Sequence, residues 1–124
     1  MTLKREEILA AQDLKSETVE VPEWGGPITL RELTALERER FQDLVVAKDG
    51  AAPMPTSRMF AWLVALCTRG EDGERLFSDG DVEAIANKSL GVLLRLGAIA
   101  QRLNSLGAEA AEDAVKNSGP SRSD

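Results

Sequence analysis

The side chains in this sequence most able to do chemistry are the carboxylates gathered between residues 72 and 83. They are Asp72, Asp79, Asp81 and Glu83. A calcium loop of the EF-hand type needs alternating carboxylates, a glycine sixth and a glutamate twelfth. Counting from Asp72, the fifth and sixth residues are Leu76 and Phe77, so this pattern fails. We therefore interpret the carboxylates as turn and helix-capping residues and predict no metal site.

Other reactive side chains are scarce. The sequence has no histidine, which is the commonest general base and metal ligand. Its single cysteine, Cys67, ends an apolar run, so we expect a buried thiol and not a nucleophile, which would need a base beside it. The sequence also lacks a glycine-rich phosphate loop and a nucleophile elbow. Together these features predict a protein that is not an enzyme and uses no cofactor.

Composition narrows the class of partner. The 124 residues carry a net charge of −6, which argues against nucleic acid as the main partner. The alternating charges of residues 37–40 are typical of a solvated helix face. No apolar run approaches the roughly 20 residues of a membrane span, and no signal peptide is visible at the N-terminus. We expect a cytoplasmic protein, and the length fits one domain.

The apolar run of residues 59–67 is the segment around which we expect the fold to be organised. It is apolar on all sides, which is typical of a buried helix. Thr56 and Ser57 are candidate caps and Gly70 is a stop signal, so we predict a helix over residues 57–69. The side chains expected to be largely buried are Trp62, Leu63, Leu66, Leu93 and Leu96.

Other segments give local signals of their own. Residues 17–22 and 28–30 alternate in polarity around a Gly25-Gly26 turn, which predicts a β-hairpin over 17–31. A capping box, Thr34 with Glu37, opens a predicted helix over 34–48, whose apolar stripe is Leu33, Leu36, Phe41, Leu44 and Val45. Ser78 and Asp81 form a similar pair before a short helix over 79–86. We also predict a short helix within residues 4–12.

The last predicted helix, over residues 89–106 and closed by Gly107, has two apolar faces. One is a heptad-like seam that ends at Leu103 and Leu106. The other contains Leu90 and Leu94, and its two interpretations, core or an interface in a homo-oligomer, stay open. The fold class is thus mainly α (α+β): an N-terminal hairpin packed on a bundle of three to four helices. The globular domain covers residues 1–107, and 108–124 form a polar, disordered tail that is dispensable for folding.

The order of several short stretches resembles the tail assembly chaperones of long-tailed bacteriophages and prophages. The matching stretches fall within residues 3–106: 20–26, 31–34, 63–66, 72–79, 81–84, 87–89 and 100–103. The most telling is Asp-Gly-Glu-Arg-Leu-Phe-Ser-Asp at 72–79, followed by Asp-Val-Glu at 81–83. Two departures are Pro27, where a polar or basic strand residue is expected, and Gly80, which weakens the short helix after Ser78.

This resemblance implies a non-enzymatic role in the host cytoplasm. Such chaperones coat the long, apolar tape measure protein while the tail tube polymerises, and they are absent from the mature virion. A longer product of a ribosomal frameshift would reach the tail tube protein. Two alternatives remain: a structural head–tail connector or minor tail component, and a small cytoplasmic protein-binding adaptor. The residues expected to contact the partner are apolar ones left uncovered by the fold: Trp24, Leu76, Phe77, Leu103 and Leu106.

Overall fold

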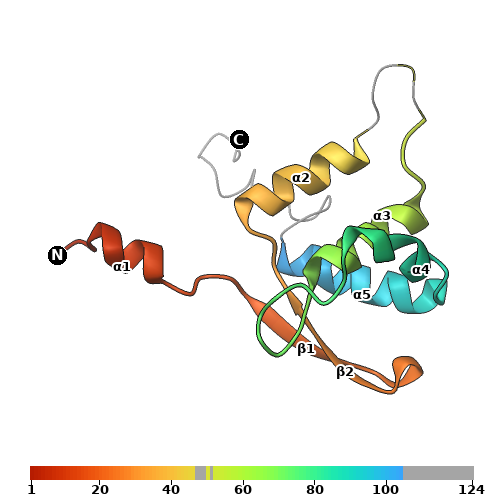
Figure 1. Ribbon diagram of the computed structural model, residues 1–124, viewed down its shortest axis with the longest axis horizontal. Helices are drawn as coiled ribbons and strands as arrows, with labels where there is room; N and C mark the ends of the chain where they lie inside the picture. Colours follow the sequence, from red (N-terminus) through yellow and green to blue (C-terminus); the bar gives the residue numbers. More distant parts are fainter. Residues whose placement is uncertain (47–49, 51, 105–124) are drawn as a thin grey trace, which may run out of the picture.

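The computed structural model describes residues 1–46, 50 and 52–104. The elements follow in this order: α1 (Arg5–Ala10), β1 (Ser16–Val21), the 3-10 turn η1 (Pro22–Trp24), β2 (Gly26–Arg31), α2 (Ala35–Val45), α3 (Thr56–Cys67), β3 (Thr68–Arg69), the 3-10 turn η2 (Asp79–Asp81), α4 (Val82–Ala86) and α5 (Leu90–Leu103). The predicted fold class, mainly helical with an N-terminal hairpin, is confirmed (Figure 1). The predicted tail at 108–124 lies outside the described residues.

The sheet is antiparallel, in the order β1-β2-β3. In the hairpin Ser16 lies opposite Arg31 and Val21 opposite Gly26. Gly25 closes the turn with φ of 92°, a conformation that residues with a Cβ resist. The third strand was not predicted, because residues 68–69 were assigned to the end of the central helix. Thr68 instead pairs with Leu30 of β2, and its hydroxyl donates to the Val64 carbonyl at 2.7 Å.

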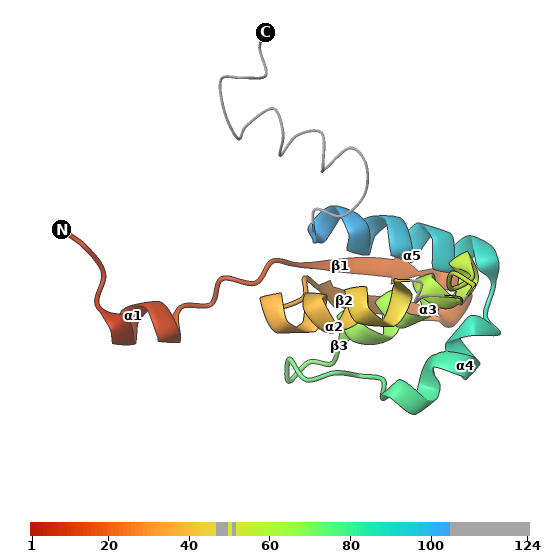
Figure 2. The ribbon, with the colours of Figure 1, turned by 90° about the horizontal axis from the view of Figure 1, so that it is seen from above.

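The core is built around α3, which packs against α4 and α5 and also contacts α2 and β2. Figure 2 shows α3 between α5 on one side and α4 on the other. Four of the five side chains expected in the core are buried, namely Leu63, Leu66, Leu93 and Leu96, whereas Trp62 is only partly buried. The predicted central helix is therefore present at the expected position. It begins at Thr56 after Pro55, however, and neither Thr56 nor Ser57 provides the expected side-chain cap.

Helix α2 begins as the sequence predicts. The Glu37 amide donates to Thr34 Oγ1 at 3.0 Å, and the Thr34 amide donates to Glu37 Oε1 at 2.9 Å. The apolar stripe of this helix was predicted less well. Phe41 is buried, but Leu36 is 74% exposed. Because α2 contacts the body along a narrow face, Leu36 is left in water.

At Gly97, α5 packs closely against the Phe60 ring of α3. A Cβ built at this position would lie 2.3 Å from Cδ1 of the Phe60 ring. We predict that Gly97→Ala lowers the free energy of unfolding by about 1–3 kcal/mol, since the overpacked ring has to shift. Chemical denaturation measures this change. Gly91→Ala is the control on the same helix, because a Cβ there meets only the Ser89 hydroxyl at 3.7 Å. A Gly97→Ala variant as stable as Gly91→Ala would contradict the packing.

Glu37 also joins the helices to the sheet. Its carboxylate accepts from Arg31 Nη2 at 2.8 Å and from the buried Arg69 Nη2 at 3.0 Å. Partial burial raises the pKa of Glu37, but the Thr34 amide and the two guanidinium groups outweigh burial and hold that pKa below its ordinary value.

A depressed pKa in the folded state makes stability depend on pH. The contribution of Glu37 is present above the ordinary glutamate pKa of 4.5 and is lost as the pH falls through the lower folded-state value. We therefore expect the Tm of the wild type to fall below about pH 4.5, and to fall less steeply for Glu37→Gln. Thermal melts at pH 7, 5, 4 and 3 check this. Parallel curves for the two proteins would exclude Glu37 as a contributor.

Candidate protein-binding site

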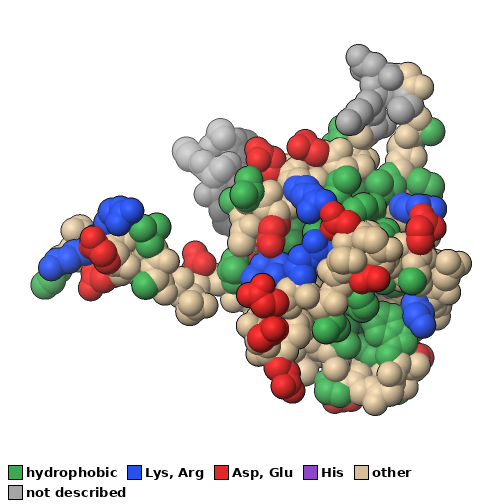
Figure 3. Space-filling model, in the orientation of Figure 1, with side chains coloured by type: hydrophobic (Ala, Val, Ile, Leu, Met, Phe, Trp, Pro, Cys, Tyr) green, Lys and Arg blue, Asp and Glu red, His purple; other side chains and the backbone are tan. Residues whose placement is uncertain are grey.

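An open apolar pocket lies between the turn of the hairpin and α4. It has a volume of about 380 Å³, and we call it the hairpin–α4 pocket. Its lining residues are Trp24, Leu76, Phe77, Asp81, Ala84, Ile85 and Lys88. Figure 3 shows hydrophobic side chains gathered on this part of the surface, over the hairpin turn and beside α4. The structure thus brings together three of the five predicted contact residues, Trp24, Leu76 and Phe77.

Three separate segments hold the pocket wall in place. Trp24 ends η1, and its neighbour Glu23 forms an ion pair with Arg95 of α5 at 3.1 Å. Leu76 donates its amide to the Thr68 carbonyl at 3.1 Å, which fixes the segment before Phe77 against β3. The Ser78 amide donates to Asp81 Oδ2 at 2.9 Å, so the capping pair predicted from sequence is present and starts η2, which leads directly into α4.

The lining residues differ in how far they are open to a partner. Ile85 is buried, and Trp24 and Phe77 are partly buried against the core. Leu76 is 55% exposed. Asp81 and Lys88 place one negative and one positive charge beside this apolar surface. Such a pocket can receive apolar side chains, while the two charges can favour one orientation of the bound segment.

The remaining two predicted contact residues do not join this pocket. Leu103 is only 9% exposed and belongs to the core cluster, so the prediction that it is left uncovered is wrong. Val92 and Leu96 of the same α5 seam are also buried in that core. Leu106 lies outside the described residues.

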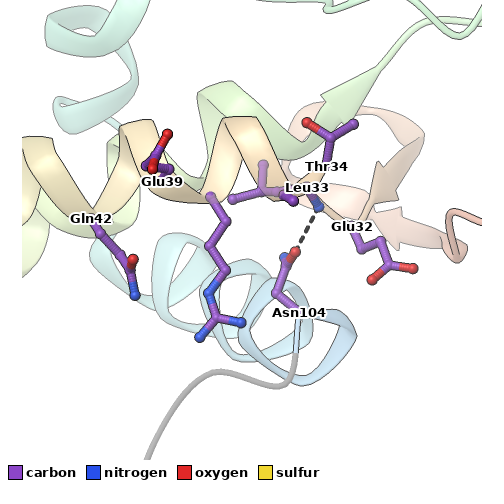
Figure 4. Close-up of a pocket in the computed structure, with 8 residues that line it drawn as sticks. Glu32, Leu33, Thr34, Glu39, Gln42 and Asn104 are labelled. Atoms are coloured by element: carbon purple, nitrogen blue, oxygen red, sulfur yellow. Dashed lines mark hydrogen bonds between the residues drawn. The ribbon is translucent and has the colours of Figure 1, made fainter.

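A second, polar pocket of about 340 Å³ lies where the end of α5 meets the start of α2 (Figure 4). Its central residue, Asn104, is 6% exposed and is not among the residues predicted from the sequence. The Asn104 amide oxygen accepts from the Leu33 amide at 2.6 Å, and its nitrogen donates to the Ala100 carbonyl at 2.8 Å. An asparagine after the last helical turn was the available signal, because asparagine is common at helix ends. We interpret this pocket as structural.

We predict that Asn104→Ala lowers the free energy of unfolding by about 1–3 kcal/mol, because the buried Leu33 amide loses its acceptor. Urea denaturation is the measurement. Asn87→Ala is the control, since Asn87 also donates to a carbonyl four residues earlier, at 3.0 Å, but at an exposed position. Equal stabilities of the two variants would show that the Asn104 contact contributes little.

The reactive side chains singled out in the sequence are either buried or held in ion pairs and turns. Burial raises the pKa of the Cys67 thiol to about 11, far from that of a nucleophile. Asp79 is held by Arg40 and Arg75, and hydrogen bonds from both hold the pKa of Asp79 below its ordinary value. Asp72 accepts from the Glu74 amide at 3.0 Å within a turn. Within residues 1–46, 50 and 52–104, no cluster of three or more potential ligands could hold a metal ion.

These features define a small α+β protein whose candidate site suits the binding of another polypeptide. The chain belongs to the phage tail assembly chaperone family, whose model matches residues 3–117. Members of this family have a generally non-enzymatic role.

The fold is similar to the solved structure of the tail assembly chaperone of bacteriophage HK97. That likeness has a TM-score of 0.59 at 24% identity and covers 79% of this chain and 94% of that chain. At this identity it concerns the fold alone. No curated protein sequence matches the chain. In the described part of the chain, no helix has both the length and the apolar character needed to cross a membrane.

Proposed function

We propose that this chain binds the tape measure protein of its phage, keeps it soluble and assists assembly of the tail tube around it, in the host cytoplasm. Membership of the tail assembly chaperone family supports the role. The observation that carries the proposal is the open hairpin–α4 pocket, which gathers apolar side chains from three separate segments into one concave surface. The tape measure protein is called the client below.

The physical argument starts from the client. A long polypeptide with an uncovered apolar stripe aggregates, because contiguous apolar surface associates in water. A pocket that accepts apolar side chains of an amphipathic helix covers part of this stripe. The net charge of −6 on each bound chain then keeps the complex soluble by repulsion between complexes. Neither step needs a covalent reaction or a cofactor.

Co-expression tests the proposal. The tape measure protein of the same phage is produced alone and together with this chain, and its soluble fraction is measured. We expect the client to be mostly insoluble alone, and soluble and co-purified with the chain when both are present. A client equally soluble in both cases, or one that never co-purifies, would contradict the proposal.

The assembly role makes a further demand, that the chain leaves before the virion is complete. We propose that it is absent from mature virions, and that a longer frameshifted form contacts the tail tube protein. Mass spectrometry of purified virions checks the first point and of induced cells the second. A stoichiometric amount of the chain in virions would favour a structural tail component instead.

A further inference from the structure

Helix α1 stands apart from the body of the molecule. Figures 1 and 2 show it at the end of the chain that leads into β1, on the side away from the hairpin turn. None of its residues is buried. Leu3, Ile8 and Leu9 are exposed to 68%, 57% and 68%. Isolated helices shorter than about 12 residues are marginal in water, so a six-residue helix needs a packing partner.

We infer that α1 of one copy docks in the hairpin–α4 pocket of a second copy, and that the client must displace it. The inference rests on the proposed function, since it assigns to the client's pocket a second, competing occupant. In this arrangement α1 occupies the client's place and covers the pocket until the tape measure protein is synthesised.

The reach of the chain indicates a second copy as the donor of α1. The linker between α1 and β1 is residues 11–15, five residues that span at most about 18 Å when fully extended. The six residues of β1 cover about 20 Å. The pocket lies at the far end of β1. To place α1 in the pocket of its own chain, a linker that reaches at most about 18 Å would have to return along a strand of about 20 Å. A neighbouring molecule has no such constraint.

The chemistry of α1 matches that of the pocket. Its exposed apolar side chains, Ile8 and Leu9, and Leu3 just before it suit the apolar lining. Its charged residues are Arg5, Glu6 and Glu7, and Lys4 precedes it. The pocket offers Asp81 and Lys88, so each sign of charge at α1 has a charge of opposite sign beside the pocket. The surfaces that meet are different, which makes the contact head-to-tail.

A peptide of residues 1–14 with a fluorescent label tests the contact directly. The receptor is the full chain with Ile8→Glu and Leu9→Glu, whose own α1 no longer competes. We expect saturable binding by fluorescence anisotropy, weakened at least about tenfold when Leu76→Glu is added to the receptor. Leu36→Glu, also an exposed leucine, should leave affinity within about twofold. No binding, or equal binding to both receptors, would overturn the inference.

Sedimentation velocity tests the contact between whole chains. We expect the wild type to associate as its concentration rises, whereas the Ile8→Glu/Leu9→Glu variant and the Leu76→Glu variant each stay monomeric. Mixing the two variants restores one intact α1 and one intact pocket and should give a one-to-one complex. A mixture that stays monomeric, or variants that associate like the wild type, would overturn the inference. Far-UV circular dichroism verifies that both variants are folded.

Failure of this inference is distinguishable from failure of the proposed function. If the Ile8→Glu/Leu9→Glu variant still solubilises the client while the peptide fails to bind, the client site stands and α1 is not its substitute. If the peptide binds but is not released when the client binds the receptor, competition between α1 and the client for the pocket is excluded. Peptide release in proportion to the bound client is the expected result.

Discussion

Replacing Leu66 by alanine is expected to lower the free energy of unfolding by about 2–5 kcal/mol, the largest stability effect foreseen for this chain. Leu66 is 2% exposed and lies in α3, the helix that contacts α2, α4, α5 and β2. Truncation removes buried apolar surface and leaves a cavity that the surrounding helices fill only in part. Since a small domain is stable by roughly 5–15 kcal/mol, the variant keeps only a reduced margin.

Urea denaturation of the variant and the wild type measures this loss. Leu94→Ala is the matched control, because Leu94 is a helical leucine that is 43% exposed. Its effect should stay within about 0.5 kcal/mol, the usual range for surface substitutions. If Leu66→Ala were no more destabilising than Leu94→Ala, α3 could not be the centre of the core.

The parts of the fold that can be predicted from the sequence are those encoded by neighbouring residues. The Thr34 and Glu37 pair and the Ser78 and Asp81 pair each act over three residues, so their helix starts are visible in the sequence. The same holds for the hairpin, where alternation and the Gly25 turn specify the pairing. The central position of α3 could be predicted in the same way, since a helix that is apolar on all sides is typically buried.

The parts that were missed depend on distant residues. Strand β3 forms because Thr68 and Arg69 meet β2, which is nearly forty residues earlier in the chain. Leu36 has the spacing of a buried residue but lies beyond the edge of the contact that α2 makes. Asn104 is important only because α5 ends beside Leu33, a proximity that no local pattern encodes.

The candidate site shows the same division. The sequence places Trp24 at the hairpin turn and Leu76 and Phe77 in an extended link, where a fold tends to leave side chains uncovered, and the structure gathers all three around one pocket. Leu103 was selected from a helical seam, and periodicity alone does not reveal which seam the core covers. The charges of Asp81 and Lys88 were not foreseen as part of the site, because they join it only through the position of α4.

Leu76→Glu is expected to have the largest effect on function. It places a carboxylate in the apolar lining, and taking that charge out of water under a bound apolar segment is unfavourable, because the desolvation cost of a buried charge can exceed what an ion pair with Lys88 returns. Leu76 is 55% exposed, so the variant should fold normally. Trp24 and Phe77 are less suitable for this test, because both also pack against the core and their truncation would confuse binding with stability.

The amount of soluble tape measure protein that co-purifies per chain, compared among the wild type, Leu76→Glu and Leu36→Glu, tests the central claim most directly. Both substitutions add the same charge at an exposed leucine, and only Leu76 lines the hairpin–α4 pocket. We expect Leu36→Glu to recover the client as the wild type does, and Leu76→Glu to recover no more than the background seen without any chaperone. Wild-type recovery by a folded Leu76→Glu variant would contradict the assignment of this pocket to the client.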